Sequence, residues 1–67
     1  MPVTIKLEGG SSWGREIVVP ELLKDFRLPL PNSDEYEIYK YTGSRDTNIV
    51  TGYVSRYYYK FYKRERI

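Results

Sequence analysis

A chain of 67 residues that contains neither cysteine nor histidine has few ways to become a stable domain. Ordering its residues costs on the order of 100 kcal/mol of conformational entropy, at roughly 1.5 kcal/mol per residue. Small domains usually offset this cost with disulfides or a structural metal. The composition excludes disulfides, thiolate and imidazole metal sites, thiol catalysis and a Ser-His-Asp hydrolase. The remaining ways to stabilise the fold are a core of large aromatic side chains or association with a partner chain.

The aromatic content is high enough to build a core, with eight tyrosines, two phenylalanines and one tryptophan in the sequence. Each of these rings buries a large area and packs with specific geometry. The length allows a single domain over residues 1–67.

The first twenty residues predict a β-hairpin. Val3, Ile5 and Leu7 alternate with polar residues, which is the period of a half-buried strand. Residues 9–12 read Gly-Gly-Ser-Ser and form a turn signal, and the β-branched stretch at residues 15–19 follows as the second strand.

Residues 20–27 predict a short helix, because Leu22, Leu23 and Phe26 share one helical face and Pro20 suits the first helical position. We expect Phe26 to pack on the sheet face that carries Val3, Ile5 and Leu7. Residues 28–34 then form a proline-stiffened connector.

Two further strands are expected at residues 36–42 and 49–63, joined by a loop. A helix is the rival interpretation of the last segment, but the consecutive residues Tyr57, Tyr58 and Tyr59 disfavour it. The predicted fold is α+β: a β-β-α-β-β antiparallel four-stranded sheet with one short helix. Small SH3-like barrels have a similar size and strand content, so a partly closed barrel of that kind is an alternative, although no motif carries the resemblance.

Charge is unevenly distributed along the chain. Residues 1–51 carry six basic and eight acidic side chains, a balance of −2, and residues 52–67 carry five basic and one acidic, a balance of +4. A basic end on a mildly acidic body suggests a polyanionic partner. The alternative is that an edge strand carries charge only to prevent aggregation.

A candidate binding face lies on the last strand. If residues 53–64 alternate strictly, one face is nearly continuous aromatic core and the other interleaves cations with rings. Cations pair with phosphates and rings stack on bases, which predicts a nucleic-acid site. Its predicted residues are Arg56, Tyr58, Lys60, Tyr62 and Arg64. The alternative is a solvated face on which Glu35 and Glu37 pair with these cations.

The remaining polar and aromatic features carry weaker signals. Trp13 follows the glycine-rich turn, and we expect it to fold back over the core instead of anchoring a ligand. The spacing of Glu35 and Glu37 suits a divalent cation, but two carboxylates alone are a weak signal. No serine has a base to activate it, so no catalytic activity, cofactor or metal is expected.

The sequence therefore predicts a small non-catalytic module that binds nucleic acid. The alternative is a protein-interaction module, such as an inhibitor, an adaptor or a phage or viral accessory protein, that uses a sheet edge or an exposed aromatic surface. A homodimer is expected if the 53–63 strand lies at a sheet edge. The longest apolar run is three residues and the N-terminus lacks signal-peptide features, so a cytoplasmic protein without a membrane partner is expected.

Overall fold

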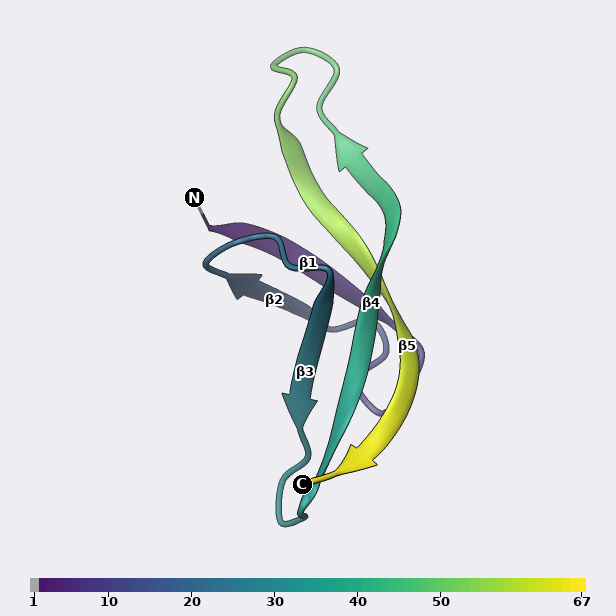
Figure 1. Ribbon diagram of the computed structural model, residues 1–67. Coiled ribbons are helices and arrows are strands. Elements are labelled where there is room, and N and C mark those ends of the chain that lie inside the picture. The colour runs from purple at the N-terminus through teal and green to yellow at the C-terminus, as the bar shows by residue number, and fades with distance from the viewer. Residues whose placement is uncertain (1) are drawn as a thin grey trace.

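The computed structural model describes residues 2–67, which form five β-strands in one mixed sheet and no helix (Figure 1). In chain order the strands are β1 (Val3–Glu8), β2 (Glu16–Val19), β3 (Asp25–Pro29), β4 (Glu35–Thr47) and β5 (Val54–Arg66). The last two strands have 13 residues each, and they form a long hairpin that extends beyond the other strands.

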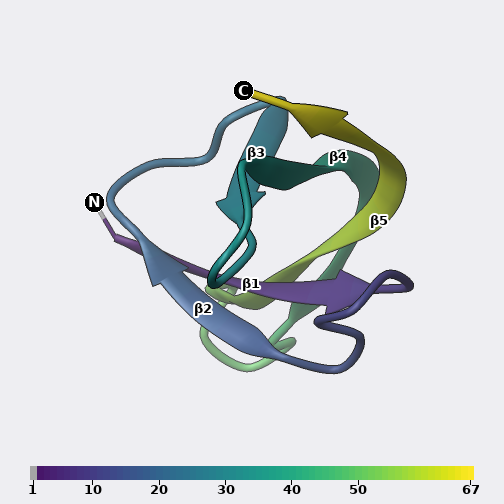
Figure 2. The ribbon, with the colours of Figure 1, turned by 90° about the horizontal axis from the view of Figure 1, so that it is seen from below.

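The sheet has the strand order β2-β1-β5-β4-β3. β1 and β2 form an antiparallel hairpin, and β3, β4 and β5 form an antiparallel meander. A parallel pairing of β1 with β5 joins these two halves, so the first and last strands lie side by side at the centre. The sheet curls strongly (Figure 2), which gives it a concave face around the core and a convex face toward the outside.

The core lies on the concave face and is built largely from tyrosine. Four side chains form a buried cluster: Ile5, Leu7, Tyr39 and Tyr59. The rings of Tyr39 and Phe61 meet edge to face with centroids 5.8 Å apart. Tyr41 contacts Tyr57 in the same manner, also at 5.8 Å. The aromatic core expected for a chain without disulfides is therefore confirmed.

The expected small domain with a β-sheet is confirmed, but the α+β class, its short helix and its four-stranded antiparallel sheet, with the SH3-like variant, are wrong. Residues 20–24 form a link, and Phe26 lies in strand β3, where Phe26 and Leu28 are half-buried while their neighbours are exposed. Phe26 does pack against the core that contains Ile5 and Leu7. Pro29 is tolerated because β3 is an edge strand. Because residues 28–34 contain Pro29 and Pro31, they were interpreted as a connector, and the alternation of half-buried and exposed residues in β3 was overlooked.

The long C-terminal strand is not an edge. β5 lies between β1 and β4, and the edges are β2 and β3. The homodimer was expected only if residues 53–63 lie at a sheet edge, and β5 instead lies inside the sheet, with residues 57–60 paired to both β1 and β4.

Trp13 does not cap the core, contrary to the expectation from sequence. Its side chain is 78% exposed, and it lies on the loop between β1 and β2. Aromatic rings from β4 and β5 already fill the concave face, so the core has no need of the indole.

Replacing Phe26 with alanine tests the packing of the edge strand. We expect Phe26→Ala to lower the free energy of unfolding by about 3 kcal/mol, because it leaves a cavity beside the core cluster. Leu23→Ala is the control, since the Leu23 side chain is half exposed in the preceding link. Urea unfolding monitored by tyrosine fluorescence measures both variants. Equal unfolding midpoints for the two variants would contradict the placement of Phe26.

Candidate nucleic-acid interface

The predicted site residues begin as expected on the convex face of β5. Tyr57, Tyr59 and Phe61 belong to the core or pack against it, so the intervening positions point the other way. These intervening residues are Arg56, Tyr58 and Lys60. The alternation inferred from the sequence therefore holds over residues 56–61.

A β-bulge at Tyr62 ends this alternation. Tyr39 on β4 is paired with Phe61, and the preceding Ile38 is paired with Lys63, so Tyr62 has no partner of its own. One extra residue shifts every later side chain to the opposite face. The predicted residue Arg64 consequently points to the concave side, where its guanidinium contacts the buried carboxylate of Glu37.

Arg56 and Tyr58 are held by carboxylates. Nε of Arg56 lies 3.4 Å from Oδ2 of Asp46 and 3.8 Å from Oε1 of Glu16. The Tyr58 hydroxyl donates a 2.7 Å hydrogen bond to the same Oδ2 of Asp46, and this bond raises the pKa of the hydroxyl. These two side chains form a polar cluster at the border of the predicted site, while the Tyr58 ring remains available.

Lys60 and Tyr62 are the members of the predicted set that have neither an ion pair nor a hydrogen bond to a carboxylate within residues 2–67. Lys60 lies opposite Glu8 on β1 and opposite Lys40 on β4. The Tyr62 ring is 54% exposed, and Nζ of Lys40 lies 4.1 Å from its centroid. Nζ of Lys63 lies 5.4 Å from the same centroid, so two cations lie near a ring that is still partly exposed.

Three lysines on neighbouring strands share the convex face: Lys6 on β1, Lys60 on β5 and Lys40 on β4. Within residues 2–67, none of them has a carboxylate oxygen within 4.0 Å. Each of the other cations in residues 52–67 does have a carboxylate oxygen within 4.0 Å: Arg56, Lys63, Arg64 and Arg66. Sequence reasoning missed Lys6 and Lys40, although each occupies a polar position between buried strand residues.

Two adjacent depressions bring these lysines together with aromatic rings. The first has a volume of about 520 Å³ and is lined by Lys6, Leu7, Glu8, Gly9, Trp13, Tyr58, Lys60 and Phe61. The second, of about 340 Å³, is lined by Lys40, Tyr41, Thr42, Lys60, Phe61 and Tyr62. Lys60 and Phe61 belong to both. We call the two depressions together the lysine groove.

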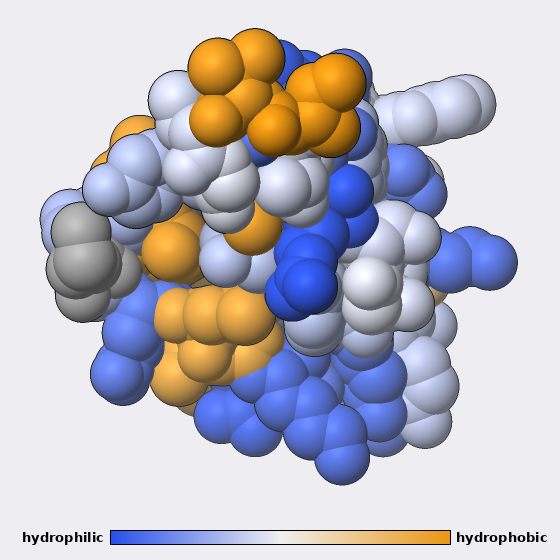
Figure 3. All heavy atoms as spheres, turned by 90° about the horizontal axis from the view of Figure 1, so that it is seen from above, coloured by the Kyte–Doolittle hydropathy of each residue, from blue (hydrophilic) through white to orange (hydrophobic). Residues whose placement is uncertain are grey.

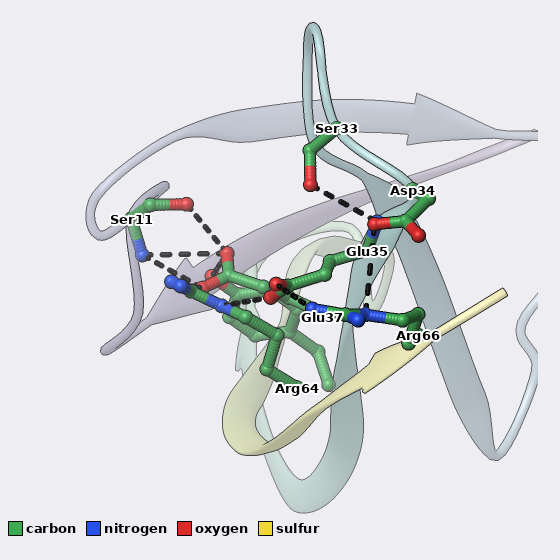
Figure 4. A network of polar contacts seen from close by, with 8 residues as sticks. Ser11, Ser33, Asp34, Glu35, Glu37, Arg64 and Arg66 are labelled. Carbon is green, nitrogen blue, oxygen red and sulfur yellow. Dashed lines mark hydrogen bonds and ion pairs between the residues drawn. The ribbon is translucent and has the colours of Figure 1, made fainter.

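A buried polar network fixes the loop that carries Trp13 (Figure 4). The Glu37 side chain has 0% exposure, and its carboxylate accepts a 2.6 Å hydrogen bond from the Ser11 hydroxyl and longer ones from the Ser11 amide. Nη2 of Arg64 donates to it at 3.1 Å, and the Tyr39 hydroxyl lies 3.3 Å away. Gly10 is needed beside this network, because a Cβ there would lie 2.5 Å from the Tyr39 hydroxyl oxygen. Arg64 thus positions the loop between β1 and β2.

Glu37 remains ionised well into acid because of these contacts. Burial by itself raises the pKa of the carboxyl, but the hydrogen bonds from Ser11, Arg64 and Tyr39 outweigh it, so the pKa lies below its ordinary value of about 4.5. Glu35, the other carboxylate of the predicted cation spacing, pairs with Arg64 and Arg66. Among residues 2–67 no group of three acidic side chains converges as a metal site requires.

Comparisons of the chain with protein-family models, with curated proteins and with solved structures found no match in any of the three. In the described part of the chain, no helix is long and apolar enough to cross a membrane.

The network gives stability a definite pH dependence. The pKa of the Glu37 carboxyl is lower in the folded state than its ordinary value. Its ionised form therefore stabilises the fold above the ordinary pKa, and this stabilisation is lost as the pH falls through the folded-state pKa. We expect Glu37→Gln to be less stable than the parent at pH 7 by about 1–3 kcal/mol. The difference in the free energy of unfolding between the two proteins should narrow below pH 4.5, because Glu37 then becomes protonated in the parent while the variant does not titrate at this position. Urea titrations of both proteins between pH 7 and pH 2.5 measure this difference, and a constant difference would disprove the role of the ionised carboxylate.

Proposed function

We propose that this chain is a small non-catalytic module that binds single-stranded nucleic acid in the lysine groove. The observation that carries the proposal is the convergence of Lys6, Lys60 and Lys40 with exposed rings on one face of three adjacent strands. Four other cations also lack a carboxylate partner within residues 2–67, but none of them lines this groove: Arg15, Lys24, Arg27 and Arg45.

The pairing of Lys40 with Lys60 supports a binding role. The two residues are direct cross-strand partners, and like charges in that position destabilise a sheet. The Tyr62 ring beside Lys40 and Glu8 opposite Lys60 offset part of this repulsion, and a phosphate placed between the two ammonium groups would relieve it further. A carboxylate at position 40 would pair with Lys60 across the strands, but the residue at this position is a lysine.

The arrangement of the rings favours single strands over duplex. Trp13 lines one depression of the groove and Tyr62 lines the other, and the half-buried Tyr58 lines the first together with Lys60. Unstacked bases are free to stack on such rings, whereas the bases of a duplex are already stacked on one another. The three lysines lie on successive strands, so the sugar–phosphate backbone would run across the strands of the sheet.

The site differs from the one inferred from the sequence. Tyr58, Lys60 and Tyr62 remain in the proposed site, and Lys6, Lys40 and Trp13 join it. Arg56 lies at its border with Asp46 and Glu16 as partners, and Arg64 acts from the concave side by holding the loop that carries Trp13.

A protein-interaction module is the other class of function, and the sheet edges give it little support. β2 has four residues and β3 contains Pro29, and short or proline-containing edges are poor templates for strand addition. An interaction with a protein would instead need exposed side chains outside the edges.

The electrostatic part of the proposal is tested by Lys60→Ala. Losing one phosphate contact should weaken binding similarly for all sequences and lower the slope of log affinity against log salt by about one. Lys24→Ala is the matched control, because it removes the same charge from an exposed residue outside the groove. Fluorescence anisotropy with labelled single-stranded DNA and RNA measures both. Failure of the parent to bind below about 100 μM at low salt would end the proposal.

The stacking part is tested at Trp13. Trp13→Ala should weaken binding to single strands by about 1–3 kcal/mol, which is roughly 5- to 150-fold, and affect duplex less. Trp13→Phe keeps a ring and should retain most of the affinity. Because the side chain is exposed, stability should change by no more than about 0.5 kcal/mol. Equal affinities of the alanine variant and the parent would remove Trp13 from the site.

A further inference from the structure

The end of the long hairpin displays apolar side chains that the sheet does not use. Residues 48–53, which we call the hairpin tip, connect β4 to β5 at the upper end of the molecule in Figure 1. Ile49 is 96% exposed, Val50 89% and Tyr53 75%. Figure 3 looks down on this end, and apolar side chains gather there in a compact patch.

The tip is held away from the body of the protein. β4 pairs with β3 only through residues 36–40, and β5 pairs with β1 only through residues 57–60. Beyond these points the two arms of the hairpin pair only with each other. The molecule measures 43 × 20 × 17 Å, and the hairpin accounts for its long dimension.

The backbone of the tip is ordered by hydrogen bonds of its own. The side-chain oxygen of Asn48 accepts from the amides of Val50 and Thr51 at 2.9 and 3.1 Å. The Asn48 carbonyl accepts from the Gly52 amide at 2.7 Å, and the Asn48 amide donates to the Tyr53 carbonyl at 2.8 Å. The Tyr53 amide donates to the Thr51 hydroxyl. Five of the six amides in residues 48–53 therefore need no water.

The tip is also uncharged. No acidic or basic residue occurs from position 47 to position 55, in a chain in which 30% of the residues are charged. The nearest charges are Arg45, Asp46 and Arg56 at the base of the arms, where Arg56 and Asp46 pair with each other. The internally bonded amides and the lack of charge lower the cost of entering an apolar site, because unsatisfied polar groups and charges are costly to bury.

We infer that the hairpin tip inserts into a concave apolar pocket of a folded partner protein, with Ile49 and Val50 as its anchors. A nucleic acid does not suit this end, since no cation lies in the tip. A lipid surface suits it less well, since Lys6, Lys40 and Lys60 line the side of the sheet and not its end. A second copy of this chain suits the tip less well, because the three main depressions among residues 2–67 are each lined by charged side chains.

The partner is identified and then tested in two steps. Photoreactive p-benzoylphenylalanine in place of Thr51 leaves both anchors intact, and the same residue in place of Val18 is the control, because Val18 is an exposed aliphatic residue on β2. Proteins crosslinked in cells of the source organism from position 51 and not from position 18 are purified and titrated with the parent chain, Ile49→Asp and Val18→Asp.

The expected result is that Ile49→Asp weakens binding to the purified partner by about 30-fold or more, as for a central anchor, while Val18→Asp changes it less than about threefold. Both variants should keep the parent's circular dichroism and its affinity for single-stranded DNA, so this test is independent of the proposed nucleic-acid function. The inference is overturned by no position-specific crosslink, or by a partner that binds Ile49→Asp as tightly as the parent. It is also overturned if Ile49→Asp abolishes sedimentation with phosphatidylcholine–phosphatidylglycerol vesicles, binding to duplex DNA, or self-association in the ultracentrifuge.

Discussion

The buried carboxylate of Glu37 is the interaction on which the arrangement of this sheet depends. A charge without solvent contact is tolerated only when it is paired and hydrogen-bonded, and here the partners come from the β1–β2 loop, from β4 and from β5. The tyrosine core around Tyr39 and Tyr59 supplies most of the cohesion, but apolar contacts have little direction. Hydrogen bonds to one fixed carboxylate do have direction, so they set where the loop and the end of β5 lie.

The bulge in β5 and the shape of the lysine groove are both related to these hydrogen bonds of Glu37. Arg64 can reach Glu37 only if the chain gains one residue in β5, and the bulge at Tyr62 supplies it. The same carboxylate accepts hydrogen bonds from Ser11, and Trp13, two residues later in this loop, lies beside Lys6 and Lys60. A structural charge on the concave side thereby shapes the candidate binding surface on the convex side.

Local patterns predicted the parts of the fold that depend on near neighbours. The sequence predicted the first strand from the alternation of Val3, Ile5 and Leu7. It also predicted the turn after this strand and the tyrosine core. The segment around Phe26 was misread because Leu22, Leu23 and Phe26 fit a helix, while Pro29 hid the alternation of an edge strand. The parallel pairing of β1 with β5 and the bulge at Tyr62 left no local signal, since both depend on residues far apart in the chain. Counting charges located a basic stretch but could not show that Arg56 and Arg64 already had carboxylate partners.

The parallel pairing of the first strand with the last also has a kinetic consequence. β5 is the central strand, yet it is the last of the five strands to be synthesised, so the β1–β2 hairpin has no sheet to join until β5 is available. Closing a loop of about fifty residues between Ile5 and Tyr57 costs entropy before any of its contacts form, and folding rates fall as such distant contacts dominate. The β3–β4–β5 meander is the more local half, so it can assemble first and offer β5 as the template on which β1 docks. Folding of this short chain is therefore expected to be slow for its length and to proceed from the C-terminal half toward the N-terminal one.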